Sequence, residues 1–326
     1  MYNQRPIFIN SFSRGGSNIL WNVFLSHPDV CSPIYETLEI FGAGITHATR
    51  RGYLIAILSG QPRLFYQWNL SPRRPVSPYV ARLIDRTFYD HKLRTLTDPE
   101  MQYKLANERY TAEEVEQSRL VAKNNNGLAF LTNVLLGIYE DASFFGLVRH
   151  PLALYEGHRR RGLTHSVENF AKFYNSIAGR MLNDAERLKC YHLVRFEDLM
   201  KAPVAVAQRL FAQTDLDFSK IRKLRFKAKP HFQKNGQYGT TFQVGRHHWF
   251  DLGQVHQILD AEVNDYQISN IASEEKARLL ELTKDVCQGL GYGAGTSTTS
   301  VSDNWSGAAS PDQLPIGPVC RGEGNK

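Results

Sequence analysis

The alternation of apolar and polar positions divides most of the chain into strands and helices. Residues 7–9 (Ile-Phe-Ile) form an uninterrupted run of β-prone residues, as in a strand that is buried on both faces. Small and polar residues follow over 13–18. From residue 19 the apolar positions recur at helical spacing until a His-Pro pair at 27–28. The pattern predicts a strand, a turn and a helix, in that order.

The same alternation resumes after residue 119. Apolar runs that predict strands, separated by segments that predict helices at 128–139 and 167–188, occur at 120–122, 143–148 and 190–194. Strands separated by helices form parallel sheets, which bind ligands beyond the carboxyl ends of their strands. We therefore expect a three-layer α/β fold with a central parallel sheet and helices on both faces. The strand ends near Arg14, Lys123 and Arg149 should line one crevice.

Three segments depart from this alternation. Residues 36–118 are mainly helical in pattern with no obvious strand, which predicts a helical insertion that walls off a ligand cleft. Residues 218–251 are basic and loop-like. From residue 294 onward, 16 of 33 residues are Gly, Ser, Thr or Pro, a composition that does not support a packed structure. We expect one α/β domain over 1–293 and a flexible tail over 294–326.

Composition narrows the classes of function. The net charge is +7, and the basic residues form local clusters such as Arg159–Arg161, which suits an anionic ligand at least as well as nucleic acid. The four cysteines lie far apart, so neither a disulfide framework nor a metal site is expected. No apolar run approaches the roughly 18–20 residues of a membrane span, and the first strand begins too early to leave room for a signal peptide. We expect a cytoplasmic protein without a nucleic-acid partner.

The turn over residues 13–18 is the first candidate site. A strand, a glycine turn and a helix N-terminus bring free backbone N–H groups and the positive end of the helix dipole to one point, where Arg14 adds a full charge. Ser17 and Asn18 can cap the helix or bind phosphate oxygens. The turn differs from the nucleoside-triphosphate loop Gly-x-x-x-x-Gly-Lys-[Ser/Thr], which is absent from the chain. A purely structural turn is the alternative.

The second candidate site follows the strand predicted at 143–148. Arg149 stands at the strand exit, and Pro151 suits the first position of the next helix. A guanidinium in this place can hold a phosphate through two parallel hydrogen bonds. The alternative is a surface arginine that pairs with a carboxylate.

The order and spacing of these motifs resemble those of the sulfotransferases that use 3′-phosphoadenosine 5′-phosphosulfate (PAPS). In that family a Pro-[Arg/Lys]-Ser-Gly-Thr-Thr loop binds the 5′-phosphosulfate, and a later Arg-x-Pro segment binds the 3′-phosphate. Residues 195–199 (Arg-Phe-Glu-Asp-Leu) are similar to the family's Tyr-Glu-Asp-Leu segment, and 244–249 to its C-terminal Gly-x-Trp region. The resemblance spans about residues 6–290. It implies a P-loop-like fold in which PAPS contacts Ser13, Arg14, Gly15, Gly16, Ser17, Asn18, Arg149 and Arg246.

Two departures from the family pattern concern the phosphate contacts. The family has a serine eight residues after the arginine of its second motif, and Gly157 stands in that place. Asn18 replaces the second threonine of the first loop. The resemblance offers a substitute for the lost hydroxyl in Arg161, because the tyrosylprotein branch of the family has a matching arginine that contacts the phosphate.

A third stretch implies a catalytic base. Residues 26–31 (Ser-His-Pro-Asp-Val-Cys) and the following Tyr35-Glu36-Thr37 are similar to a motif of the tyrosylprotein and some carbohydrate sulfotransferases, with one extra residue between the halves. In that branch the matching glutamate is the general base, which implies the same role for Glu36. A glutamate that opens a helix is otherwise a first-turn charge favoured by the dipole. Lys123 is a candidate for additional positive charge, with a solvated surface lysine as the alternative.

The resemblance implies transfer of a sulfuryl group from PAPS to a hydroxyl of a carbohydrate, a small molecule or a peptide tyrosine. No metal is required, because fixed cations can neutralise the developing charge. A non-catalytic nucleotide- or sulfate-binding protein on the same scaffold is an alternative, and Gly157 favours it. A P-loop kinase is a weaker alternative, because the loop lysine and the paired aspartates for magnesium are missing.

Overall fold

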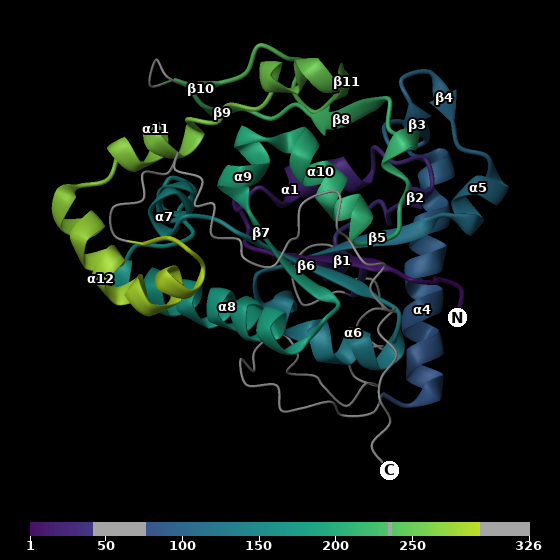
Figure 1. Ribbon diagram of the computed structural model, residues 1–326, viewed down its shortest axis with the longest axis horizontal. Helices are drawn as coiled ribbons and strands as arrows, with labels where there is room; N and C mark the ends of the chain where they lie inside the picture. Colours follow the sequence, from purple (N-terminus) through teal and green to yellow (C-terminus); the bar gives the residue numbers. More distant parts are fainter. Residues whose placement is uncertain (42–75, 234–236, 294–326) are drawn as a thin grey trace, which may run out of the picture.

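The computed structural model of the protein describes residues 1–41, 76–233 and 237–293 (Figure 1). A parallel five-stranded sheet with the strand order β2-β5-β1-β6-β7 lies at the centre of the described chain. Its strands are β1 (Ile7–Ser11), β2 (Val30–Cys31), β5 (Arg119–Asn125), β6 (Ser143–Val148) and β7 (Tyr191–Arg195). This arrangement confirms the expected α/β fold with a central parallel sheet.

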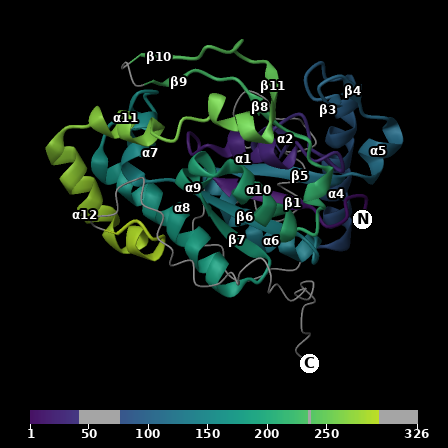
Figure 2. The same ribbon diagram turned by 45° about the horizontal axis from the view of Figure 1, so that its top comes forward.

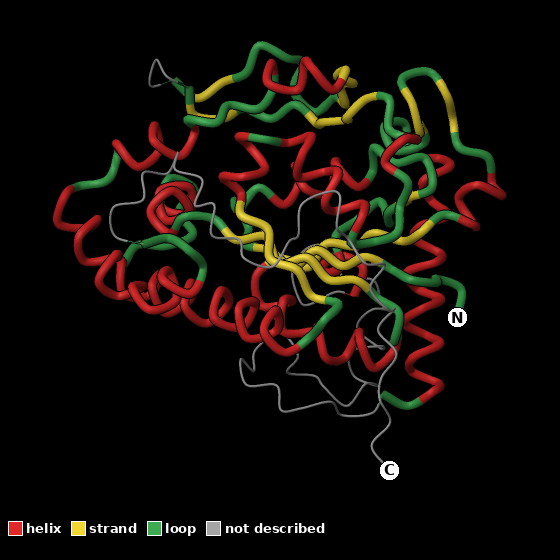
Figure 3. Tube along the Cα trace, viewed as in Figure 1, coloured by secondary structure: helices red, strands yellow, loops and turns green. Residues whose placement is uncertain are grey.

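Helices lie on both faces of the sheet (Figures 1 and 3). One face is covered by α4 (Pro78–Leu93), α6 (Thr132–Ile138) and α8 (Val167–Arg187), and α12 (Ser273–Gly289) packs against α8. The other face is covered by α1 (Ser17–Phe24), α9 (Phe196–Lys201) and α10 (Pro203–Ala212). Parallel strands need crossover connections, and these place helices on both faces.

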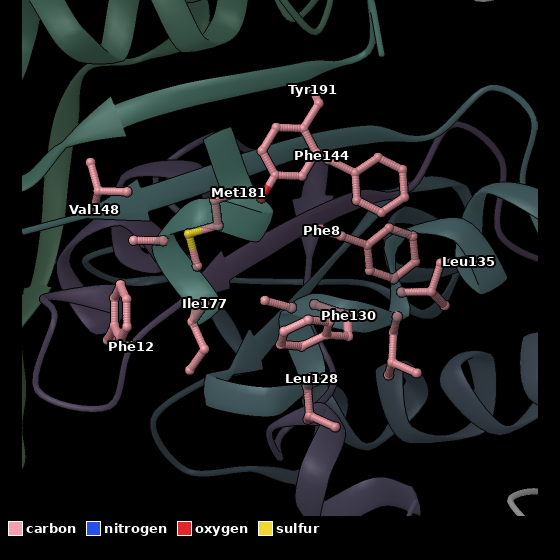
Figure 4. Packing of buried hydrophobic residues seen from close by; sticks show 14 of the residues in the cluster. Phe8, Phe12, Leu128, Phe130, Leu135, Phe144, Val148, Ile177, Met181 and Tyr191 are labelled. Atoms are coloured by element: carbon pink, nitrogen blue, oxygen red, sulfur yellow. The ribbon is translucent and has the colours of Figure 1, made fainter. Parts of the chain in front are cut away.

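Successive residues of the central strand belong to two separate cores, because side chains alternate across a strand. Ile7 and Ile9 belong to the core that includes α1 and α10, whereas Phe8 belongs to the core that includes α4, α6 and α8. Figure 4 shows the ring of Phe8 beside that of Phe144, with 5.3 Å between the ring centroids. Both faces of β1 are buried, which is why its apolar run is uninterrupted.

The described part of the predicted insertion contains short strands as well as helices. Besides α2 (Thr37–Phe41), α4, the 3₁₀ turn η1 (Arg94–Thr97) and α5 (Ala112–Gln117), it contains a hairpin of β3 (Tyr103–Leu105) and β4 (Glu108–Arg109). The segment is therefore mainly helical, as expected, but it also contains two short strands that the pattern did not indicate. Strands of two or three residues are too short to show an alternation, so the pattern could not indicate them. Residues 42–75 of the expected insertion lie outside the described residues.

The basic segment 218–251 is also more regular than expected. After the 3₁₀ turn η3 (Phe218–Lys220) it forms an antiparallel pair of β8 (Lys223–Lys227) and β11 (His247–Asp251) and a second pair of β9 (His231–Phe232) and β10 (Tyr238–Gly239). In β8 a buried arginine, Arg225, stands between buried Leu224 and Phe226, so the usual alternation of apolar and polar residues is hidden. These strands form a further layer outside α1 (Figures 1 and 2).

The remaining elements connect these layers. The helix predicted at 128–139 begins as the 3₁₀ turn η2 (Asn126–Leu131) and continues as α6. The other connecting elements are α7 (Pro151–Arg159), η4 (Leu252–Gln257) and α11 (Val263–Ser269). Within the described ranges no helix is long and apolar enough to cross a membrane, and no group of three or more His, Cys, Asp or Glu side chains could hold a metal ion. The expected tail over 294–326 lies outside the described residues.

Candidate active site

A cavity of about 390 Å³ lies where the central strands end. Its floor contains the turn 13–18 after β1, Asn125 at the end of β5, Arg149 after β6 and Phe196 after β7. The carboxyl ends of parallel strands meet at one edge of a sheet, which explains why these distant segments converge. The roof contains residues of β8, β9, β10 and α11. The expected crevice is therefore present, although Asn125 rather than Lys123 lines it at the end of β5.

The turn 13–18 has a backbone that requires glycine. Gly16 has a φ of +91°, in the left-handed region, and a Cβ atom there would overlap the ring of Phe196. A Cβ atom on Gly15 would lie 2.9 Å from the carbonyl oxygen of Phe12. No side chain caps the first turn of α1. The Ile19 N–H donates to the Gly16 carbonyl, so the N–H groups of Ser17 and Asn18 are the ones left open to an anion in the cavity. The side chains of Ser13, Arg14, Ser17 and Asn18 also line this cavity.

Glu36 lines the same cavity and is held from two sides. Its Oε1 lies 2.8 Å from Lys123 Nζ, and its Oε2 accepts a hydrogen bond from the side-chain amide of Asn125. About a third of the Glu36 side chain is exposed, so the carboxylate remains accessible from the cavity. Both contacts fix the direction of the carboxylate, which suits a group that must accept a proton in a defined geometry.

Lys123 is not the solvated surface lysine that the sequence left open. It lies within β5 and is 2% exposed. Its ammonium donates to Asn18 Oδ1 at 2.7 Å, pairs with Glu36 and lies 4.7 Å from the ring centroid of Trp21. Burial lowers the pKa of Lys123, and the nearby Glu36 carboxylate acts in the opposite direction. Lys123 thus connects the turn 13–18 to Glu36 from below the cavity surface.

Arg149 is buried and is held by neutral groups, so the alternative of a surface arginine paired with a carboxylate is wrong. Its Nε and Nη2 donate to Asn264 Oδ1 at 2.9 and 2.6 Å, and Nη2 also donates to Gln267 Oε1 at 2.6 Å. Its Nη1 donates to the carbonyl oxygen of Arg14 at 2.8 Å. Burial lowers the pKa of Arg149 to about 10, so it stays protonated at neutral pH. The amides occupy Nε and Nη2, so a two-bond grip on a phosphate is not available in this arrangement.

The helix α7 and the residues directly after it bring further groups to the cavity. Gly157 and Arg160 line it, and the guanidinium of Arg160 lies 4.4 Å from the ring centroid of Tyr238. Arg161 donates to the Tyr238 hydroxyl at 3.3 Å and lies beside the cavity rather than in its lining. Arg246 pairs with Glu100 on the protein surface and does not line the cavity. Of the expected phosphate contacts beyond the turn, the cavity therefore contains Arg149, with Arg161 at its edge.

Sequence reasoning missed the residues that roof the cavity. They come from segments more than 200 residues after the turn 13–18 and include Lys227, Lys229, His231, Asn264 and Gln267 near or in the lining. The basic stretch over 227–229 was visible in the sequence, but a local pattern does not indicate against which part of the fold such a stretch packs. The pKa of Lys229 is lowered to about 8, mainly by burial and secondly by repulsion from the charge of Lys123. More than a third of the residue's surface is nevertheless exposed.

Comparisons with known proteins identify the family of the chain. The profile of a sulfotransferase family matches residues 6–220, which is most of the chain. A search of curated proteins finds no significant match. The sulfotransferase domain of the olefin synthase from Synechococcus PCC 7002 superposes with a TM-score of 0.53 at 19% identity, covering 90% of this chain and 96% of that domain.

Two other solved structures are similar at lower scores. The sulfotransferase domain from the curacin biosynthetic pathway has a TM-score of 0.49 at 18% identity and covers 89% of this chain and 98% of that one. A mouse sulfotransferase in complex with PAP has a TM-score of 0.40 at 10% identity, with coverages of 90% and 88%. The fold is shared with the olefin synthase domain, and the family profile covers β1 to η3 with the turn 13–18 and Arg149. The chain belongs to the sulfotransferase family.

Proposed function

We propose that the protein transfers a sulfuryl group from PAPS to a hydroxyl group of an acceptor. The observation that carries this proposal is the convergence on one cavity of an uncapped glycine turn, a buried arginine and a carboxylate held by a lysine. PAPS has an anionic group at each end of its nucleoside. The cavity offers Arg14 and the first turn of α1 to one of these groups, and the charges of Arg149 and Arg160 to the other.

The residues divide into two binding groups under this proposal. Arg14 and the backbone N–H groups at the start of α1 would hold the 5′-phosphosulfate, whereas the N–H groups of Ser13 and Gly15 already donate to Asn126 and Phe12. Arg149 would contribute its charge and its remaining Nη1 hydrogen to the 3′-phosphate. Arg160 and Arg161, directly after α7, would add charge. Arg246 pairs with Glu100 outside the cavity, and we do not assign it a contact with the donor.

Glu36 would act as the general base. As the acceptor oxygen forms its bond to sulfur, Glu36 takes the hydroxyl proton, and the bond between sulfur and the bridging phosphate oxygen breaks. Arg14 and the turn amides stabilise the negative charge that develops on the departing phosphate. Lys123 acts through its contacts with Glu36 and Asn18, because it orients the base and places a positive charge near the reacting groups. The leaving product is adenosine 3′,5′-bisphosphate (PAP).

Direct measurements can test this function. The full chain is incubated with ³⁵S-labelled PAPS and separate panels of hydroxylated sugars, small molecules and tyrosine peptides. Sulfated product from one panel is the expected result. Binding of PAPS without turnover in all panels would favour the non-catalytic alternative, and preference for ATP with magnesium over PAPS would favour a kinase.

A chain that ends at residue 293 should retain activity, because we propose that residues 1–293 form the catalytic domain.

The room beside Gly157 allows a gain-of-binding test. A Cβ atom at Gly157 would lie 3.5 Å from the Cβ of Arg14, an ordinary contact distance, so a serine side chain fits. Gly157→Ser should therefore tighten PAP binding about tenfold, by one hydrogen bond to a charged group. Titration calorimetry measures the change. Gly137→Ser in α6 is the matched control, because it adds the same side chain to open space outside the cavity. Equal or weaker binding by Gly157→Ser would contradict the placement of the 3′-phosphate.

Lys229 should make donor binding depend on pH. An amine is cationic below its pKa, so the positive charge of Lys229 is present at pH 7 and is lost as the pH rises through about 8. PAP affinity should therefore fall about fivefold between pH 7 and 9, because one cation near the bound anion is neutralised. Lys229→Arg keeps its charge over this range and should abolish most of the fall. An equal fall in the arginine variant would assign the effect to another group.

A further inference from the structure

Asn264 lies between two buried groups of opposite charge. Its Oδ1 accepts from Arg149 Nε and Nη2, and its Nδ2 donates to Glu197 Oε1 at 2.6 Å. The side chain is buried, with 2% of the residue exposed. The two neighbours also determine the orientation of the amide, because a guanidinium only donates and an ionised carboxylate only accepts. The amide thus takes the position in which a direct ion pair of Arg149 with Glu197 would otherwise form.

Glu197 is held in place without an ion pair. Its Oε1 also accepts from the backbone N–H of His150 at 2.9 Å, and its Oε2 accepts from the hydroxyl of Tyr292 at 2.7 Å. Within the described residues no salt bridge joins either Glu197 or Arg149 to an opposite charge. The carboxylate is satisfied by neutral donors, so it does not need the guanidinium as a partner.

Arg149 is oriented in the same way by neutral acceptors. Of its five N–H groups, four donate hydrogen bonds: one on Nε, one on Nη1 and two on Nη2. The second N–H of Nη1 has no partner within the described residues. The guanidinium also lies 4.2 Å from the ring centroid of Phe196. A carboxylate in the place of either amide would hold the side chain as well, but it would cancel most of the charge that an anion in the cavity can meet.

We propose that Asn264 and Gln267 are positioning residues that orient Arg149 with neutral amides and separate its charge from Glu197, so that the cation stays available to the 3′-phosphate of the donor. This inference rests on the proposed function, because it assigns a phosphate to Arg149. It explains why a buried arginine that faces the cavity is surrounded by amide and carbonyl oxygens rather than by acids.

The decisive comparison is between a variant that changes charge but keeps shape and a variant that only removes the contact. Gln267→Glu places a carboxylate on Arg149 Nη2, and Gln267→Ala removes the contact without adding charge. If the amide serves only to hold the side chain, the glutamate variant should bind PAP at least as well as the alanine variant. If neutrality matters, the order reverses: Gln267→Glu should weaken PAP binding about tenfold or more, and beyond Gln267→Ala. Adenosine 5′-phosphosulfate, which lacks the 3′-phosphate, should bind both variants nearly as well as it binds the unaltered protein.

A second pair of variants tests Asn264 itself. Asn264→Asp should also weaken the binding of PAP more than the binding of adenosine 5′-phosphosulfate. The double variant Asn264→Asp with Glu197→Gln keeps the total charge but places the carboxylate directly against the Arg149 guanidinium. It should show the same selectivity. Equal losses for both ligands, or Gln267→Glu binding PAP as well as Gln267→Ala does, would overturn the inference and leave the proposed function standing. Failure of the unaltered protein to bind PAP would overturn both. Thermal melting of each variant verifies that the fold persists.

Discussion

Glu36→Gln is expected to lower kcat by about 10²–10⁴-fold, the usual contribution of a positioned general base. Glutamine keeps the length and planar shape of the side chain, and its oxygen can still accept a hydrogen bond from Lys123 or Asn125. It cannot take a proton from an acceptor hydroxyl. The donor side of the cavity is unchanged, so PAP binding should stay within a few-fold of the unaltered protein. Steady-state kinetics and calorimetry together measure the two quantities.

The buried ammonium of Lys123 makes a stability control necessary for this variant. Removing the Glu36 charge leaves the Lys123 ammonium with neutral partners in place of the paired carboxylate, so the melting temperature should fall. Activity must be compared at a temperature at which the variant is folded. Glu186→Gln, on the exposed surface of α8, removes the same charge far from the cavity and should leave kcat unaltered. A Glu36→Gln enzyme with kcat within threefold of the unaltered protein would rule out the role of base.

Arg14→Ala is expected to lower kcat/KM by about 10²–10³-fold. The Arg14 side chain is exposed and lines the cavity, so it can meet the anionic group that the turn is proposed to bind without being needed for the core. The loss should appear mainly in kcat, because the charge on the phosphate increases as the sulfuryl group leaves. Arg14→Lys should recover part of the activity, because it restores the charge but not the planar fork of donors.

The matched control for this variant is Arg82→Ala, an exposed arginine of α4 that does not line the cavity. Its activity should equal that of the unaltered protein. The φ of Arg14 is +65°, a left-handed conformation that alanine tolerates no better than arginine, so the backbone strain is the same in both. Unaltered melting temperature with lost activity is the expected combination. Full activity of both Arg14→Ala and Arg149→Ala would contradict the assignment of the cavity to PAPS.

The central fold could be predicted from sequence because each of its main strands has a local signal. Residues 7–9 and 143–148 are apolar without interruption, since both of their faces are buried, and glycines at 15 and 16 indicate a backbone that comes close to its neighbours. The strands of the hairpin β3–β4 and of β8 to β11 lack such a signal. They are short or contain buried charges such as Arg225, and their pairing depends on contacts between distant segments.

The same distinction applies to the site. The sequence by itself determined the turn 13–18, the position of Arg149 after a strand and the candidate base Glu36, because these depend on local motifs and on their order. Only the tertiary structure decided that Lys123 is buried against Glu36, and that Arg149 is held by Asn264 and Gln267 from α11. Burial and charge pairing depend on which elements pack above and beside a residue. Local pattern does not contain that information when the partners are about 90 or 115 residues away.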